Sequence, residues 1–143
     1  MTTLTGECFC GDIGYEIRGP LAPATSCHCS RCRKAFSGAG SAMSRVDPAA
    51  FAWTRGADLL QTYVNREGVG LGFCRRCGTT LCGLSNGDVM GITLGTLNGD
   101  PEATIGQHIF VGSKASWDEI GGNAPQFAAW PHAEDAPIGR SDT

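Results

Sequence analysis

The chain has 143 residues, 41% of them hydrophobic, which favours one folded domain over a disordered segment. A net charge of −3 argues against general nucleic-acid binding, which needs a basic face. No apolar run approaches the ~20 residues of a membrane helix, and the N-terminus lacks the pattern of a secretory signal. We therefore expect a cytoplasmic protein with neither a nucleic-acid partner nor a membrane partner.

Composition also bounds the kind of fold. The 21 glycines and 7 prolines predict many short strands joined by tight turns, with little helix. The eight cysteines indicate metal binding, because thiols stay reduced in the cytosol. Disulfides are the alternative interpretation of the same cysteines.

Alternation of apolar and polar residues locates most of the expected strands. Residues 13–18 alternate in this way before Gly19-Pro20, which predicts a half-buried strand. Ser30 is expected to cap a short helix that reaches Phe36 and is closed by Gly38. Further strands are expected at 41–46, 51–53, 59–64, 79–84, 88–94 and 107–111.

Turn and cap signals fill the remaining part of the chain. Asn86-Gly87 predicts a hairpin turn between two strands. Residues 116–119 (Ser-Trp-Asp-Glu) have the spacing of a capping box, which predicts a helix start. From Gly121 onward we expect a loop, followed by a loose tail after about His132.

Two cysteine pairs, Cys8/Cys10 and Cys74/Cys77, resemble zinc knuckles, because each pair is followed by a glycine. A glycine at that position permits a positive φ, so that the backbone can wrap around a metal ion. Together the pairs supply the four thiolates of a closed structural zinc site, which would tie residue 8 to residue 77. The alternative is that they are unrelated cysteines packed as small hydrophobic residues.

A second cluster, Cys27, Cys29 and Cys32, places three cysteines within six residues. In an extended chain Cys27 and Cys29 point the same way, and a helical turn from Ser30 would bring Cys32 to the same face. Three protein ligands and one exchangeable position are typical of catalytic zinc. A thiol entering that position would lose its proton and could attack a small electrophile.

Several interpretations of the neighbouring residues stay open. His28 can be an ordinary hydrogen-bonded histidine or can take part in the chemistry. Cys82 can be a fourth ligand of the second site or a plain strand cysteine. The three thiols can also act without metal, as a nucleophile and its resolving partners. The basic residues can form a solvated face, offset thiolate charge or receive an anionic ligand; they are Arg31, Arg33, Lys34, Arg75 and Arg76.

The cysteine pattern resembles that of the glutathione-dependent formaldehyde-activating enzyme (GFA) family. The resemblance spans residues 6–120 and rests on Gly6-x-Cys8-x-Cys10-Gly11-x-Ile13, Cys27-His28-Cys29-x-x-Cys32-Arg33 and Phe73-Cys74-x-x-Cys77-Gly78. A weaker match is His108-Ile109-Phe110-Val111 with Lys114 and Trp117.

The resemblance implies a mainly β fold, a β-tent of antiparallel sheets around the zinc sites, as a single domain over residues 1–143. It implies two zinc ions, a structural one on Cys8, Cys10, Cys74 and Cys77 and a catalytic one on Cys27, Cys29 and Cys32. It also implies a carbon–sulfur lyase that forms or breaks down S-(hydroxymethyl)glutathione, with glutathione and formaldehyde as its partners.

Two other functions fit the same residues. The protein can bind glutathione or another small thiol without turnover. It can also be a scaffold in which both zinc ions are structural and the surface binds a protein. A related use of such folds, methionine sulfoxide reduction, needs a nucleophilic cysteine late in the chain, and no cysteine follows Cys82.

Overall fold

The computed structural model describes residues 2–131, which form a mainly β chain of two compact units. Among these residues, unit 1 contains 2–22 and 44–103, and unit 2 contains 23–43 and 104–131. Each unit is described separately. The expected tail after about His132 lies outside the described residues, and the single domain stays a prediction.

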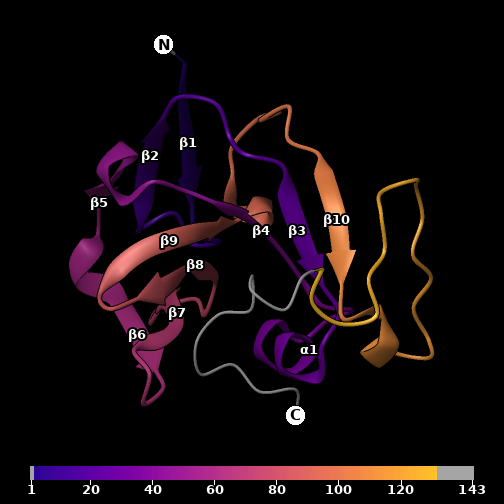
Figure 1. Cartoon of the computed structure of the whole chain (residues 1–143). Coiled ribbons are helices and arrows are strands. Elements are labelled where there is room, and N and C mark those ends of the chain that lie inside the picture. Colours follow the sequence, from indigo (N-terminus) through magenta and orange to yellow (C-terminus); the bar gives the residue numbers. More distant parts are fainter. Residues whose placement is uncertain (1, 132–143) are drawn as a thin grey trace. The chain divides into compact units, whose positions relative to one another are not determined.

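Unit 1 is built from antiparallel strands (Figure 1). Three of them pair in the order β1-β2-β5: β1 (Thr3–Glu7), β2 (Gly14–Arg18) and β5 (Phe51–Arg55). Four more pair in sequential order: β6 (Leu60–Val64), β7 (Val69–Cys74), β8 (Thr80–Ser85) and β9 (Asp88–Thr93). Three short 3-10 helices lie in the connections: η1 (Pro48–Ala50), η2 (Ala57–Leu59) and η3 (Leu94–Thr96).

The core of unit 1 gathers the inward-facing residues of these strands. Its fully buried side chains include Ile13, Tyr15, Leu81 and Ile92, and Phe51 and Trp53 of β5 pack against them. The Tyr15 ring stacks on Phe51, with 5.3 Å between ring centroids. Alternation along β2 therefore buries one face of the strand, as the sequence predicts.

Unit 2 contains the helix and two paired strands that meet it. β3 (Ala24–Cys27) leads into α1 (Ser30–Phe36), and β10 (Ile105–Ile109) runs parallel to β3 (Figure 1). β4 (Ser41–Arg45), whose first three residues belong to unit 2, pairs antiparallel with β3. The 3-10 helix η4 (Val111–Ser113) follows β10.

Most of the expected strands are confirmed, and the Asn86-Gly87 turn is present with positive φ at both residues. Four details of the prediction are wrong. The helix is capped by Cys29 rather than Ser30, and it ends at Ser37 in the left-handed conformation rather than at Gly38. No helix starts at residues 116–119, where the chain forms a turn, and the strands β3 and β10 are parallel.

Candidate metal centres

The four-cysteine cluster, Cys8, Cys10, Cys74 and Cys77, lies within unit 1 and brings its sulfur atoms within 4.8 Å of one another. The Cys8 and Cys10 sulfur atoms are 3.6 Å apart, and those of Cys10 and Cys74 are 3.9 Å apart. A zinc ion with Zn–S bonds of ~2.3 Å at the centre of a tetrahedron gives S–S edges of ~3.8 Å. The donor set and its spacing therefore fit zinc.

The two knuckles of this cluster have matching backbones. Gly11 has φ of +83° and Gly78 has φ of +82°, and each donates its N–H to the carbonyl of the first cysteine of its pair, Cys8 or Cys74. An L-residue rarely adopts this conformation. The glycine that follows each pair therefore permits the turn, as the sequence predicts.

The four thiols of this cluster lie close enough to shift the pKa of one another. Burial raises the pKa of the Cys77 thiol, but hydrogen bonds from Thr79 and the Cys10 backbone outweigh it and bring the pKa to about 6. The Asp12 backbone lowers the pKa of Cys10, yet burial and the neighbouring thiols raise it to about 12. Four thiolates this close repel one another, and a metal ion between them removes that repulsion.

The three-cysteine cluster, Cys27, Cys29 and Cys32, lies within unit 2, and its sulfur atoms are also within 4.8 Å of one another. Cys27 ends β3, Cys29 caps α1 and Cys32 lies in the first turn of the helix. The Cys29 sulfur accepts a hydrogen bond from the Cys32 backbone N–H at 3.3 Å. A change from strand to helix within six residues thus gathers the three sulfur atoms, as predicted.

The surroundings of the three-cysteine cluster are apolar. Cys27 and Cys29 are 4% and 2% exposed, and Cys32 is partly buried. They pack in one hydrophobic cluster with Ile109, the last residue of β10, and with Phe110, which follows it. Three converging sulfur ligands fit zinc or another thiophilic metal, and the low-polarity surroundings strengthen charge interactions there.

His28 does not join the three-cysteine cluster, although it lies between two of its members. Its Nε2 lies 3.0 Å from His108 Nδ1 and 3.2 Å from Ser26 Oγ, so it is a buried, hydrogen-bonded histidine. Its Nδ1 makes no hydrogen bond within residues 2–131 and lies 3.8 Å from an Asp118 carboxylate oxygen. Burial, followed by the proximity of His108, lowers the pKa of His28, which is therefore neutral at pH 7.

Sequence reasoning missed the roles of His108 and Asp118 in this polar group. His108 lies in a quoted motif, but its contact with His28 spans 80 residues and depends on the parallel pairing of β3 with β10. Asp118 lies in the turn that the capping-box signal assigned to a helix. The Lys114 ammonium donates to the carbonyl groups of Ala115 and Asp118, which stabilises that turn.

Cys82 and the basic residues also have clear places. Cys82 is fully buried in the core of unit 1 and belongs to neither sulfur cluster found in residues 2–131. Burial raises the pKa of its thiol to about 11, which supports the interpretation of Cys82 as a strand residue that is not a metal ligand.

The five basic residues are divided between the two units. Arg75 and Arg76 belong to unit 1, where Arg76 forms an ion pair with Asp12 at 2.8 Å. Arg31, Arg33 and Lys34 belong to unit 2.

Comparisons with known proteins agree with this geometry. The family described as "Glutathione-dependent formaldehyde-activating enzyme" matches residues 3–113. A crystal structure of a Rhodobacter sphaeroides protein, a structural-genomics target, matches with a TM-score of 0.53 and 23% identity over 85% of this chain and 98% of that one. This likeness supports the fold alone.

No curated protein gave a significant match. Among the described residues, none of the helices has the length and apolar character needed to cross a bilayer.

Proposed function

The chain belongs to the family of glutathione-dependent formaldehyde-activating enzymes, and from this premise we propose that it is a zinc-dependent carbon–sulfur lyase. Its reaction would form or break down S-(hydroxymethyl)glutathione or a similar adduct of a thiol and an aldehyde. The observation that carries the proposal is the convergence of Cys27, Cys29 and Cys32 within the part of the chain that matches the family.

The two clusters receive different roles in this proposal. Cys8, Cys10, Cys74 and Cys77 would hold a structural zinc ion, because four protein ligands close the site. Cys27, Cys29 and Cys32 would hold the second ion, because three protein ligands are typical of catalytic zinc. When bound there, zinc supplies a lowered pKa for a substrate thiol and thus a thiolate at neutral pH.

The reaction needs a nucleophilic sulfur, a dry site and a carrier for one proton. In the forward direction the thiol sulfur forms a bond to the aldehyde carbon, the carbonyl π bond breaks, and the proton of the thiol ends on the oxygen. Ile109 and Phe110 keep water from the buried sulfur atoms. His28, held by His108 and Ser26, or a water molecule would carry the proton.

The test is exchange spectroscopy by NMR on glutathione and formaldehyde with the metal-loaded protein. We expect exchange faster than the spontaneous reaction, and loss of that acceleration in Cys29→Ser. Cys82→Ala is the matched control, since it removes a buried cysteine that belongs to neither cluster. If the wild type accelerates exchange with none of several small thiols, the protein is not a lyase of this kind.

A second candidate is a protein that holds glutathione or another small thiol without turnover. The low exposure of Cys27 and Cys29 favours it, because a buried site retains a ligand well. It predicts saturable binding of glutathione by calorimetry, lost in Cys29→Ser, together with no acceleration of exchange. No heat at millimolar glutathione would dismiss this candidate.

We also propose a cytoplasmic location. Five cysteines of unit 1 are free thiols, as expected in a reducing compartment: Cys8, Cys10, Cys74, Cys77 and Cys82. Localisation of a tagged full-length chain by cell fractionation would test it.

A further inference from the structure

Strand β6 lies at an open edge of the antiparallel strands of unit 1 (Figure 1). It pairs with β7 on one side, and no strand pairs with its other side within residues 2–131. Arg75 donates its backbone N–H to the Leu59 carbonyl, and Asn65 donates its own to the Val69 carbonyl. Because bonded pairs alternate along an antiparallel ladder, the even-numbered residues of β6 direct their backbone groups away from β7.

These outward backbone groups are available for pairing. Leu60 uses its N–H in a bond to the Ala57 carbonyl. The Leu60 carbonyl and both backbone groups of Thr62 and Val64 have no hydrogen-bond partner within the described residues. Such an edge is a template for a further strand, and proteins usually protect it with proline, charge or a bulge. Residues 60–64 contain neither proline nor a charged residue, and their pairing with β7 has no bulge.

The β6–β7 hairpin also exposes apolar side chains. Tyr63 is 70% exposed, Val64 is 46% exposed, and Val69 at the start of β7 is 36% exposed. They make up half of the large hydrophobic side chains that are exposed among residues 2–131. Burial of apolar area is favourable, so apolar side chains gathered beside an open strand edge favour contact with another chain.

We propose that β6 pairs with β6 of a second copy of this chain, antiparallel and about a two-fold axis at Thr62. This inference does not depend on the proposed lyase reaction. In this register Thr62 lies opposite Thr62 of the second copy, and Leu60 lies opposite its Val64. The outward groups then bond Thr62 N–H to Thr62 O and Val64 N–H to Leu60 O, and symmetry repeats each bond.

Charges beyond the two ends of the strand favour a second copy as the occupant. Asp58 lies two residues before β6 and Arg66 lies two residues after it, and both are exposed. Neither belongs to an ion pair of the described residues. An axis at Thr62 places Asp58 of each copy opposite Arg66 of the other. A second copy therefore supplies the complementary order of charges by itself, which an unrelated peptide does not.

The same charges select the register. An axis moved by one residue to Gln61 would place Asp58 opposite Val64, so that a carboxylate would face an apolar side chain. The opposite move, to Tyr63, would place Arg66 opposite Leu60. With the axis at Thr62 the strand instead matches threonine with threonine and leucine with valine, which are favoured cross-strand pairs.

One pair of short edge strands makes a small contact. Its area falls below the ~1,200 Å² of stable complexes, so we expect a reversible dimer with a Kd of roughly 10–100 µM.

The first experiment measures self-association of the full-length, metal-loaded chain by sedimentation equilibrium between roughly 5 and 500 µM. We expect an equilibrium of monomer and dimer in the wild type. Thr62→Pro should stay monomeric, because proline removes the outward N–H and leaves the bonds to β7 intact. Thr62→Ala keeps that N–H and is the matched control, with a Kd within about threefold of the wild type.

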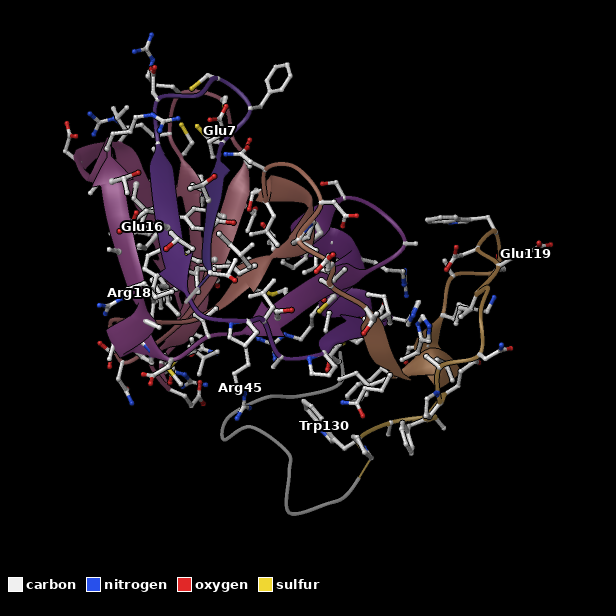
Figure 2. All side chains as sticks on the ribbon, turned by 90° about the horizontal axis from the view of Figure 1, so that it is seen from above. Glu7, Glu16, Arg18, Arg45, Glu119 and Trp130 are labelled. Carbon is white, nitrogen blue, oxygen red and sulfur yellow. The ribbon has the colours of Figure 1, made fainter. Side chains whose placement is uncertain are left out.

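The second experiment reverses the charges. Asp58→Lys and Arg66→Asp each place like charges opposite one another at both ends of the paired strands, and each should weaken the dimer about tenfold at low salt. The double variant should return the Kd to within about threefold of the wild type. Glu119→Lys is the matched control, since Glu119 is exposed, belongs to unit 2 and lies outside β6 (Figure 2). Its Kd should equal that of the wild type.

Amide hydrogen exchange tests which occupant covers the edge. The Thr62 and Val64 amides should exchange slowly at high protein concentration and rapidly at low concentration. Protection at every concentration would show that the edge is covered within one chain, and rapid exchange at every concentration would show that no second copy covers it. Either result would overturn the proposal.

Two results of the sedimentation series would also overturn the proposal. One is a monomeric wild type at every concentration. The other is a dimer that survives Thr62→Pro and does not respond to charge reversal at Asp58 or Arg66, which would place the contact elsewhere. Unchanged circular dichroism and metal content would show that each variant is folded.

Discussion

The close approach of Gly6 to Tyr15 gives a sharp test of how unit 1 packs. The two residues are directly opposite in the β1–β2 pair, and a Cβ at position 6 would overlap the Tyr15 ring. The ring cannot move aside easily, because it is fully buried, stacks on Phe51 and has its hydroxyl 2.8 Å from Thr96 Oγ1. Gly6→Ala therefore forces the β1 backbone away from the ring.

The expected cost follows from two opposing effects. Overpacking a core of this kind costs about 1–3 kcal/mol, and removing the flexibility of a glycine from the unfolded chain returns about 0.4–1 kcal/mol. We predict that Gly6→Ala lowers the free energy of unfolding by about 1–2 kcal/mol. Urea denaturation of the metal-loaded protein, followed by circular dichroism, measures this change.

Two further variants separate the contact from a general effect of alanine. Gly95→Ala is the control, since Gly95 is exposed and a Cβ there meets no atom within 4 Å; its stability should change by less than about 0.5 kcal/mol. In Tyr15→Leu, which lacks the outer ring atoms, the added cost of Gly6→Ala should nearly vanish. An equal cost of Gly6→Ala in both backgrounds would refute the assignment to the Tyr15 ring.

Three other predictions concern unit 1. Cys82, fully buried with a thiol pKa raised to about 11, should resist iodoacetamide at pH 8 in the folded protein. Mass spectrometry should find Cys77, whose thiol pKa is brought to about 6, labelled after chelation, and labelling of Cys82 at the same rate would contradict this. Gly78→Ala should lower the free energy of unfolding by about 1–2 kcal/mol, because the φ of Gly78 is +82°, although a Cβ there would meet no atom within 4 Å. An unchanged midpoint of urea denaturation would exclude backbone strain as the cause. Thr93→Val should lower the free energy of unfolding by about 1–3 kcal/mol, since the Thr93 hydroxyl lies within hydrogen-bond distance of two carbonyl groups and of the Thr96 hydroxyl. Thr93→Ser, which keeps the hydroxyl, should retain most of the stability.

Local signals account for what the sequence predicts well. The alternation of residues 13–18 and the Asn86-Gly87 turn each act over a few residues, and both appear in the structure as β2 and the β8–β9 hairpin. The three-cysteine cluster is local too, because six residues that change from strand to helix fix the relative positions of its sulfur atoms. The four-cysteine cluster is distant in sequence, but the repeated knuckle with its glycine reveals it.

Contacts that join distant segments explain what the sequence does not reveal. The parallel pairing of β10 with β3 places His108 beside His28, and no periodicity in either segment indicates it. Residues 116–119 match the capping-box sequence, yet the chain forms a turn there instead of a helix. The Lys114 ammonium donates hydrogen bonds to the carbonyl groups of Ala115 and Asp118 in this turn. Residues 125–130 lie in a stretch rich in Gly, Pro and Ala that is typical of a loop, yet five backbone hydrogen bonds join them to residues 108–112. This pairing depends on His108 of β10 and on residues 110–112, which follow the strand, rather than on any pattern within residues 125–130.

The different sequence spans of the two cysteine clusters bear on the order in which metal is acquired during synthesis. A nascent chain that has emerged as far as Cys32 already carries all three sulfur ligands of one cluster, and closing so short a loop costs little entropy. The other cluster joins residues such as Cys10 and Cys74, which are 64 positions apart, so it must wait until the second knuckle has left the ribosome. Metal can therefore bind the short cluster during translation, whereas at the long one it joins strands of two sheets, because Cys8 and Cys10 follow β1 and Cys74 ends β7.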